Sequence, residues 1–206
     1  MRKNKKWLPV LVTFLVIVPL VAAACGKDKK DDKGGAVELT ETFASSTGFT
    51  VKYPNGWAAR DGGAGPEIAN SEAAFTQLDA EDRGEIAEGQ FVLVIFDPTQ
   101  FRELPGLADL DAKAVVTMIA GSMSSEGGDE GMTAGEVKDA KVGDRDAGRT
   151  EVSDPSVKGQ GLILGYKLDD TTVILVVALA REGELGNYEA TVTAMLTALT
   201  YTAPAG

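Results

Sequence analysis

The side chains that could do chemistry in this 206-residue chain are carboxylates and one thiol, because the sequence contains no His. Without an imidazole there is no Ser-His-Asp or Cys-His catalysis and no His-containing zinc site, and a single Cys forms no internal disulfide. The sequence also lacks a nucleophile-elbow motif, a phosphate-binding Gly loop and a dinucleotide fingerprint. We therefore expect a protein that is not an enzyme and that uses no cofactor.

Acidic clusters are the remaining candidates for a binding site. Five carboxylates fall within ten residues, and two acidic pairs lie in Gly-rich segments: Asp79, Glu81, Asp82, Glu85 and Glu88, with Asp129-Glu130 and Asp144-x-Asp146. Calcium takes about six to eight oxygen ligands, and no stretch has the ordered Asp-x-Asp-x-Asp-Gly loop with its closing Glu. The clusters are thus interpreted as solvated loop charge. Binding of a cation or small solute by these acidic loops stays as the alternative function.

The single thiol lies at the end of an export signal. Arg2, Lys3, Lys5 and Lys6 precede an uncharged stretch, Leu8 to Ala24, which ends in Ala22-Ala23-Ala24-Cys25. Small residues followed at once by Cys resemble the bacterial lipobox, in which the Cys thiol is acylated with a palmitate-type chain and the leader is removed. Ala22 stands where that pattern prefers Leu. The sequence predicts a lipoprotein signal peptide over residues 1–24 and a lipid on Cys25.

Two other interpretations of the leader stay open. Ala22-x-Ala24 also fits an ordinary secretory cleavage site, and 17 uncharged residues are at the short end of what spans a bilayer, so an uncleaved anchor is possible. Ordinary cleavage would release a soluble protein, whereas a lipid on Cys25 or an uncleaved anchor would hold the domain at the extracytoplasmic face of the cell membrane; all three interpretations place the domain outside the cytoplasm.

Residues 25–36 follow as the acylated Cys and a charged tether with no apolar side chain larger than alanine after Cys25. The remaining segment, 37–206, is predicted to be a single domain. It carries 12 basic and 28 acidic residues, so its formal net charge is 12 − 28 = −16. Nucleic acid and anionic lipid are therefore not expected as partners of the domain, and membrane contact is expected only through the anchor at Cys25.

Strand patterns run through the domain. Residues 49–53 alternate apolar and polar side chains before Pro54-Asn55-Gly56 turns the chain towards Trp57. Two longer runs, 91–96 and 173–180, are apolar throughout, which is typical of strands covered on both faces. Further strands are predicted over 136–142, 147–152 and 160–168, and the segment 168–173 predicts an antiparallel hairpin.

Two amphipathic helices provide the covering layers. One is predicted from Asp109 to Ser125, with a buried face formed by Leu110, Ala114, Val115, Met118, Ile119 and Met123. The second lies near the end of the chain and buries Tyr188, Val192, Met195, Leu196 and Leu199. Together, the predicted strands and helices indicate a mainly antiparallel sheet between helices.

The segment from Phe49 to Trp57, with Tyr53-Pro54-Asn55-Gly56-Trp57 at its end, resembles the opening signature of the PsbP-like superfamily. The closing part, from Ala180-Arg181-Glu182-Gly183-Glu184 to Tyr201, is similar to the last helix and short strand of those domains. Together the two matches frame residues 37–203.

The resemblance implies an α+β fold, an α/β/α sandwich with a central, mainly antiparallel twisted sheet. Many members of the superfamily are bacterial lipoproteins without known activity, and some are assembly or stabilising subunits. Metal association through His and carboxylates, proposed for certain members, is not expected here. The resemblance thus implies a membrane-anchored, non-catalytic lipoprotein that binds or stabilises an unidentified protein partner in the cell envelope. Trp57 itself is predicted to pack in the core.

Overall fold

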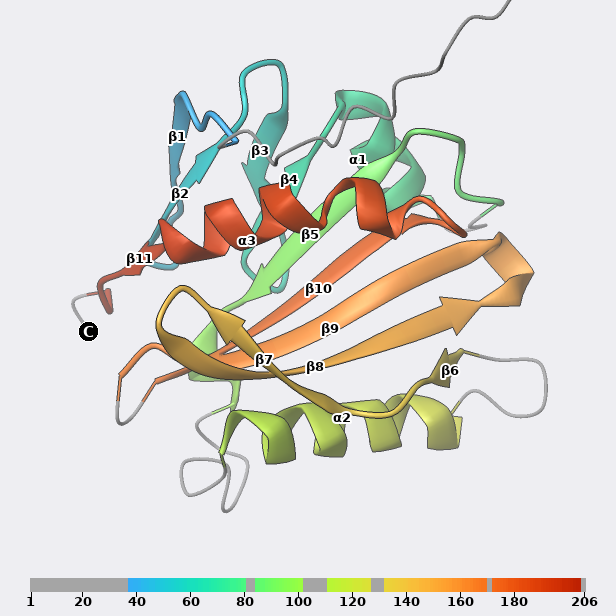
Figure 1. Ribbon diagram of the computed structural model, residues 1–206. Coiled ribbons are helices and arrows are strands. Elements are labelled where there is room, and N and C mark those ends of the chain that lie inside the picture. Colours follow the sequence, from blue (N-terminus) through green and yellow to red (C-terminus); the bar gives the residue numbers. More distant parts are fainter. Residues whose placement is uncertain (1–36, 81–83, 102–110, 127–131, 170–171, 205–206) are drawn as a thin grey trace, which may run out of the picture. The chain divides into compact units, whose positions relative to one another are not determined.

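Helices lie on both faces of an eight-stranded sheet in the computed structural model of the chain, which describes residues 37–80, 84–101, 111–126, 132–169 and 172–204 (Figure 1). The predicted signal peptide, Cys25 and the tether lie outside these residues. Residues 34–206 form one compact unit. Within the described ranges, no helix has the length and apolar character required to span a bilayer.

The large sheet contains eight strands. Their bounds are Ala58–Asp61 (β3), Pro66–Ala69 (β4), Phe91–Phe96 (β5), Thr133–Ala134 (β6), Lys138–Val142 (β7), Arg145–Asp154 (β8), Gly159–Lys167 (β9) and Val173–Arg181 (β10). They run in the spatial order β3-β4-β5-β10-β9-β8-β6, with β7 also paired to β8. Each pair is antiparallel, and the sheet twists along this order (Figure 1).

A second, three-stranded sheet joins the two ends of the described chain. It contains Glu41–Ala44 (β1), Phe49–Tyr53 (β2) and Thr200–Tyr201 (β11), in the order β1-β2-β11. Just beyond the paired residues, the Thr202 amide donates a hydrogen bond of 2.9 Å to the Gly48 carbonyl. The last residues of the fold thus complete a sheet that the first residues begin.

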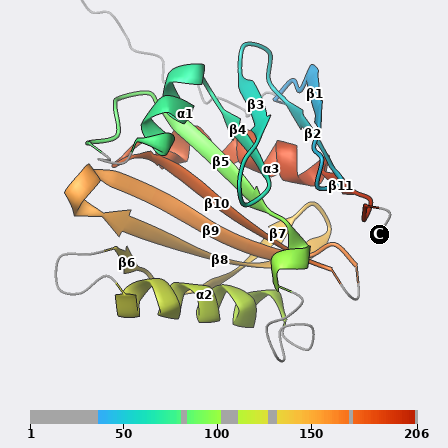
Figure 2. The same ribbon diagram turned by 180° about the vertical axis from the view of Figure 1, so that it is seen from behind.

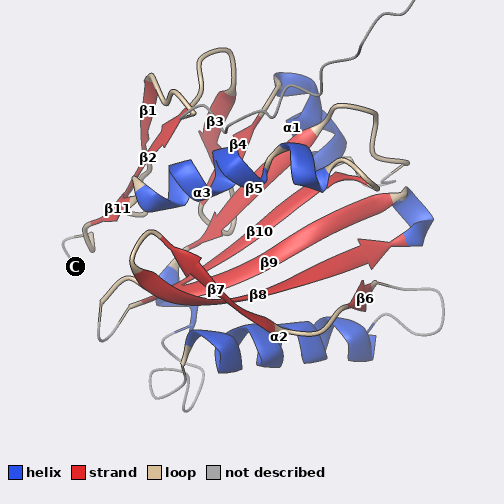
Figure 3. Cartoon of the chain, in the orientation of Figure 1, coloured by secondary structure: helices blue, strands red, loops and turns tan. Residues whose placement is uncertain are grey.

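The helices form the outer layers. They are Glu72–Asp79 (α1), Ala112–Glu126 (α2) and Glu189–Thr197 (α3), with short 3-10 helices at Pro98–Phe101 (η1), Pro155–Val157 (η4) and Leu185–Asn187 (η5). Figures 1 and 2 show α3 on one face of the large sheet and α1 and α2 on the other; Figure 3 separates these helices from the strands by colour.

The apolar strand β5 shows why both faces are covered. Successive side chains of a strand point to opposite faces. Phe91, Leu93 and Ile95 belong to the main core, which also holds Val192, Met195 and Leu196 of α3. Val92 and Val94 instead pack with Ala74 and Phe75 of α1. The predicted α/β/α sandwich of the α+β class, with its mainly antiparallel twisted sheet, is confirmed.

The buried face of α2 differs from the prediction. Met118, expected inside, is 38% exposed, whereas Ala112, Val116 and Ala120 are buried. The cause lies in the sheet, where Gly148 of β8 meets α2 so closely that a Cβ atom there would lie 2.5 Å from the Cα of Lys113. A helix that approaches glycine backbone this closely turns its small side chains inward. Leu110 and the side chain of Met123 lie outside the described residues.

The other predicted elements are present with shifted ends. The strands expected over 136–142, 147–152 and 160–168 are β7, β8 and β9, and the predicted antiparallel hairpin joins β9 to β10. The closing helix buries Val192, Met195 and Leu196 as predicted. The sequence patterns gave no indication of β1, β3, β4, β6 or α1.

Candidate functional site

The acidic residues predicted as possible ligands lie apart, and several are occupied by ion pairs. Asp79 pairs with Arg60 at 2.7 Å and Glu85 with Lys158 at 2.7 Å, and both contacts hold the carboxyl pKa below its ordinary value. Asp146 pairs with Lys141 at 2.9 Å. In the described part of the chain, no three His, Cys, Asp or Glu side chains gather as a metal site would require. Cys25, Glu81, Asp82, Asp129 and Glu130 lie outside it.

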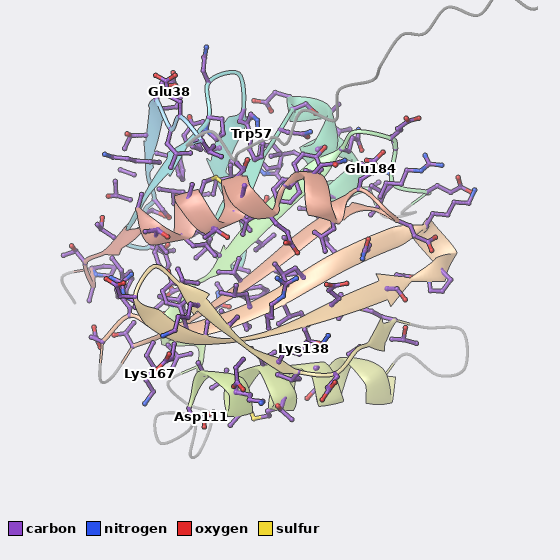
Figure 4. The ribbon with its side chains drawn as sticks, in the orientation of Figure 1. Glu38, Trp57, Asp111, Lys138, Lys167 and Glu184 are labelled. Atoms are coloured by element: carbon purple, nitrogen blue, oxygen red, sulfur yellow. The ribbon has the colours of Figure 1, made fainter. Side chains whose placement is uncertain are left out.

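Trp57 packs against the core, as predicted. The turn before it places Gly56 at φ +81° and closes with a 3.3 Å hydrogen bond from the Trp57 amide to the Pro54 carbonyl, as in a type II turn. The half-buried indole lies 5.5 Å from the ring of Phe91 and 6.3 Å from that of Tyr188 (Trp57 is labelled in Figure 4). Trp57 therefore connects the turn to the sheet and to the start of α3.

A pocket opens on the face of the sheet opposite to α3. Figure 2 shows this face, which carries α1 and α2. Its floor is one row of directly paired residues across four strands: Val92 of β5, Leu179 of β10, Gly161 of β9 and Val152 of β8. We call these four residues the floor row. Because paired residues point to the same face, the row forms a continuous apolar strip.

Glycine allows side chains to lie close to the backbone along this strip. Gly161 has no side chain, and a Cβ atom there would lie 2.7 Å from Val152 Cγ2 and 3.1 Å from Leu179 Cδ2. Gly159, two residues earlier on the same strand and so on the same face, is overlain by Ile86 and Val157, whose methyl carbons would lie 3.0 and 3.1 Å from a Cβ. The two glycines thus expose backbone at the floor, and aliphatic side chains of the floor and walls approach it closely.

The walls come from α1, from the segment 84–90 and from η4. The residues that line the pocket are mostly apolar: Ala74, Gln77, Leu78, Gly84, Ile86, Gln90, Phe91, Val92, Met132, Val152, Asp154, Val157, Gly159, Gly161 and Leu179. The cavity volume is about 90 Å³.

Two glutamines give the pocket its polar character. Gln77 of α1 holds the segment 84–90 in place, because its side-chain amide donates to the Glu85 carbonyl and accepts a 3.3 Å hydrogen bond from the Ala87 amide. Gln90 Oε1 is buried and has no hydrogen-bond partner among the residues that the structure describes. A buried carbonyl acceptor without a donor is a position where a ligand donor is favoured.

Among the described residues of the lining, Asp154 is the one that carries a charge. Its Oδ1 accepts a hydrogen bond of 3.0 Å from the Ser156 amide and another from the Ser156 hydroxyl, which fixes the start of η4. The lining therefore carries one negative charge at the pocket wall.

A second hollow, on the other side of β8, is wider and polar. Its lining includes the carboxylates of Glu151 and Glu182 and the side chain of Gln160. Glu151 already pairs with Arg149 at 3.2 Å, and Gln160 donates to Glu151 at 3.3 Å and accepts from the Gly183 amide at 3.1 Å. Its polar groups are thus largely satisfied within the protein.

Of the residues chosen from the sequence as candidate ligands, none that the structure describes lines the apolar pocket. The signal that could have indicated it is Gly159-x-Gly161 at the start of an otherwise apolar strand, because alternate glycines in a strand mark one face where something approaches closely. The walls come from segments distant in sequence, which the pattern of residues does not bring together.

Comparison with known proteins gave matches of structure only. The chain matches no protein-family model, and no curated protein sequence matches it. Among solved structures, cyanobacterial PsbP (CyanoP) from Synechocystis is similar over 82% of this chain and 96% of its own, with 13% identity and a TM-score of 0.48.

Two further structures are similar at the same level. A protein from Bacteroides thetaiotaomicron has 12% identity and a TM-score of 0.47 over 81% of this chain and 50% of its own. The Saccharomyces cerevisiae Ran-binding protein Mog1p has 12% identity and a TM-score of 0.43 over 80% of this chain and 96% of its own. The sequence resemblance to the PsbP-like superfamily is thus accompanied by a similarity of fold, at identities no higher than 13%.

Proposed function

We propose that this chain is a lipid-anchored, extracytoplasmic and non-catalytic binding protein, which binds or stabilises another component of the cell envelope through the pocket on the floor row. The observation that carries the proposal is the pocket itself, an apolar hollow with few polar groups on a face that α1 and α2 cover incompletely. Binding sites typically combine such apolar walls with a small number of polar groups that orient the ligand.

The leader supports the proposed export of the chain and its attachment to the membrane. The basic residues before Leu8, the uncharged stretch and the position of Cys25 support export and acylation. One acyl chain gives only marginal membrane binding, whereas two or more hold a protein firmly. Intact mass of membrane-extracted protein tests this step: a chain that starts at Cys25 without added acyl mass would rule out the lipid anchor.

The contacts of the acidic residues favour this proposal over cation binding by acidic loops. Asp79, Glu85 and Asp146 each have a basic partner within 3 Å, so an incoming cation would have to compete with it. Calorimetric titration with calcium, manganese and zinc discriminates the two functions, since tight stoichiometric uptake of any of them would support the alternative.

Site-specific photocrosslinking in living cells tests the binding function. A photoreactive amino acid at Leu78, which lines the pocket, should give one discrete adduct, and the same group at exposed Ala73 on α1 should not. Filling the pocket with Ala74→Leu should remove the adduct formed at position 78, whereas Ala73→Leu should leave it. The same adduct from both positions, or an adduct that persists in Ala74→Leu, would show that partners do not bind at this pocket.

A further inference from the structure

We infer that the pocket receives an aliphatic side chain from a basic segment of the partner protein, with a donor of that segment bound to Gln90 Oε1. This inference rests on the proposed function and specifies what the site recognises. Three properties of the pocket lead to it: its volume, its unpartnered acceptor and the charge around it.

The volume selects the class of side chain. The cavity measures about 90 Å³, which is smaller than the cavity of about 150 Å³ that accommodates benzene in a protein interior. The volume therefore favours a side chain smaller than an aromatic ring. A branched aliphatic group such as that of leucine fits, and its methyl groups would meet Leu179, Val152 and Val92 of the floor row.

The acceptor selects a peptide over a hydrocarbon. Gln90 lines the pocket, and its Oε1 is buried and lacks a donor among the described residues. A peptide carries a backbone N–H next to every aliphatic side chain, so one segment provides both the apolar group and the donor. An acyl chain would bury the same apolar surface but has no N–H to donate to the Gln90 carbonyl, so it would not gain this hydrogen bond.

The negative charge of the domain favours a basic segment as the ligand of the pocket. Asp154 is the charged member of the lining among the described residues, and the domain carries a formal net charge of 12 − 28 = −16 from residue 37 onwards. Two basic side chains contact the segment 84–90 behind the lining: Lys158 pairs with Glu85 at 2.7 Å, and Arg181 donates to the Ile86 carbonyl at 3.4 Å. A segment with Lys or Arg beside its aliphatic residue is therefore attracted, and an acidic one is repelled.

Binding of defined peptides tests the inference. The full chain is placed in phosphatidylcholine nanodiscs, whose lipid has no net charge and does not attract basic peptides. Fluorescein-labelled Gly-Ser peptides with Lys-Leu-Lys, Lys-Ala-Lys, Lys-Phe-Lys or Glu-Leu-Glu at the centre are compared by fluorescence anisotropy. Lys-Leu-Lys should bind in a saturable manner, and replacing its Leu by Ala should weaken binding by about tenfold or more, as expected for the lost burial of one aliphatic side chain.

Protein variants locate the binding. Ala74→Leu, which fills the pocket, should abolish binding of the Lys-Leu-Lys peptide, and Ala73→Leu on the exposed side of the same helix should not. Asp154→Asn should reduce the salt dependence of binding, and Gln90→Met, which removes the acceptor at similar size, should weaken binding of every peptide that enters the pocket. If Ala74→Leu fails to fold, as judged by circular dichroism, Val157→Phe at the rim takes its place.

Several results would overturn the inference. They are equal affinity of the Lys-Leu-Lys and Lys-Ala-Lys peptides, tighter binding of the Phe or Glu peptides, and unchanged binding in the filled variant. Equal affinity for leucinamide alone would identify a small-molecule site instead. The proposed function fails separately, when the cellular adduct at position 78 survives Ala74→Leu. If that adduct is lost but the peptides all bind with equal affinity, the pocket still binds a partner, and only the inferred chemistry of that partner is wrong.

Discussion

Arg60 shows how one residue joins three elements of this fold. Its guanidinium donates to Glu67 of β4 at 2.7 Å and to Asp79 of α1 at 2.7 Å, and it lies 4.2 Å above the ring of Phe75. The hydrogen bonds to Asp79 and Glu67 raise the pKa of Arg60, and Asp79 makes the largest contribution. Glu67 is nearly buried, with 11% of its side chain exposed, whereas 57% of the Asp79 side chain is exposed. The two carboxylates therefore depend on Arg60 to different degrees.

We predict that Arg60→Met lowers the free energy of unfolding by about 2 kcal/mol, because it leaves the Glu67 carboxylate buried without a counter-charge. Adding Glu67→Gln to Arg60→Met should recover part of this loss. Chemical denaturation of the two variants measures both effects. Asp79→Asn is the control and should cause a far smaller change, because its carboxylate stays in water. If Arg60→Met and Asp79→Asn lowered the free energy of unfolding equally, the loss in Arg60→Met could not be assigned to the buried carboxylate of Glu67.

Side-chain roles were the least predictable part of the structure. The sequence shows that Asp79 and Glu85 are acidic, but their partners, Arg60 and Lys158, lie 19 and 73 positions away (79 − 60 and 158 − 85). Whether these carboxylates form ion pairs with basic side chains or gather into one acidic cluster therefore depends on the fold. Gly161 of the floor row poses a related difficulty: Gly159-x-Gly161 marks one face of a strand as closely approached, but the pocket walls come from segments distant in sequence.

At the scale of elements, local patterns predicted the strands better than the helix packing. Strands β2 and β5 have the predicted bounds, because alternation and apolar runs are properties of the strand itself. The buried side of α2 was predicted wrongly at Met118, since the choice between neighbouring helix faces depends on what the sheet presents. Here the sheet presents Gly148 and Gly165, and Val116 and the backbone at Ala112 fill the space above them.

We predict that Gly148→Ala destabilises the protein by about 2 kcal/mol, because its Cβ would collide with backbone atoms of α2, the Cα of Lys113 at 2.5 Å and the Ala112 carbonyl at 3.0 Å. Backbone cannot move aside as a flexible side chain can. Thermal unfolding of the purified variant measures the loss.

Gly121→Ala, on α2 itself, is the matched control. A Cβ at Gly121 meets nothing within 4 Å, and alanine is the better helix former, so this change should stabilise the protein by about 0.5 to 1 kcal/mol. If Gly148→Ala and Gly121→Ala changed the stability in the same direction, close packing of α2 on the glycines would not explain the position of the helix.

At the scale of the whole molecule, carboxyl groups with lowered pKa determine how the stability of the fold depends on pH. The pKa of Asp61 is lowered by hydrogen bonds from the Ser45 hydroxyl and the Ser46 amide, and those of Asp79 and Glu85 are lowered by Arg60 and Lys158. A carboxyl group whose pKa is lower in the folded than in the unfolded state adds stability above its unfolded pKa, near 4, and this contribution disappears as the pH falls through the folded pKa.

We therefore predict that the stability difference between the protein and its Asp61→Asn variant is constant above about pH 5 and shrinks below about pH 4. Comparing the two proteins cancels the repulsion among the other carboxylates. The chain has no His, so neither protein should show a transition in stability near pH 6.5 that arises from an imidazole. Denaturation curves from pH 8 to pH 3 measure this; a difference that grows on acidification would have the wrong sign.

The small sheet that joins β1, β2 and β11 also sets an order of events during synthesis. β2 receives its second neighbour only from Thr200–Tyr201, and the Gly48 carbonyl receives its donor only from Thr202. Contacts between the earliest and latest parts of a chain form slowly and late. During synthesis the β8-β9-β10 region can assemble from neighbouring segments, but this corner has to wait until Thr200, Tyr201 and Thr202 have emerged from the ribosome.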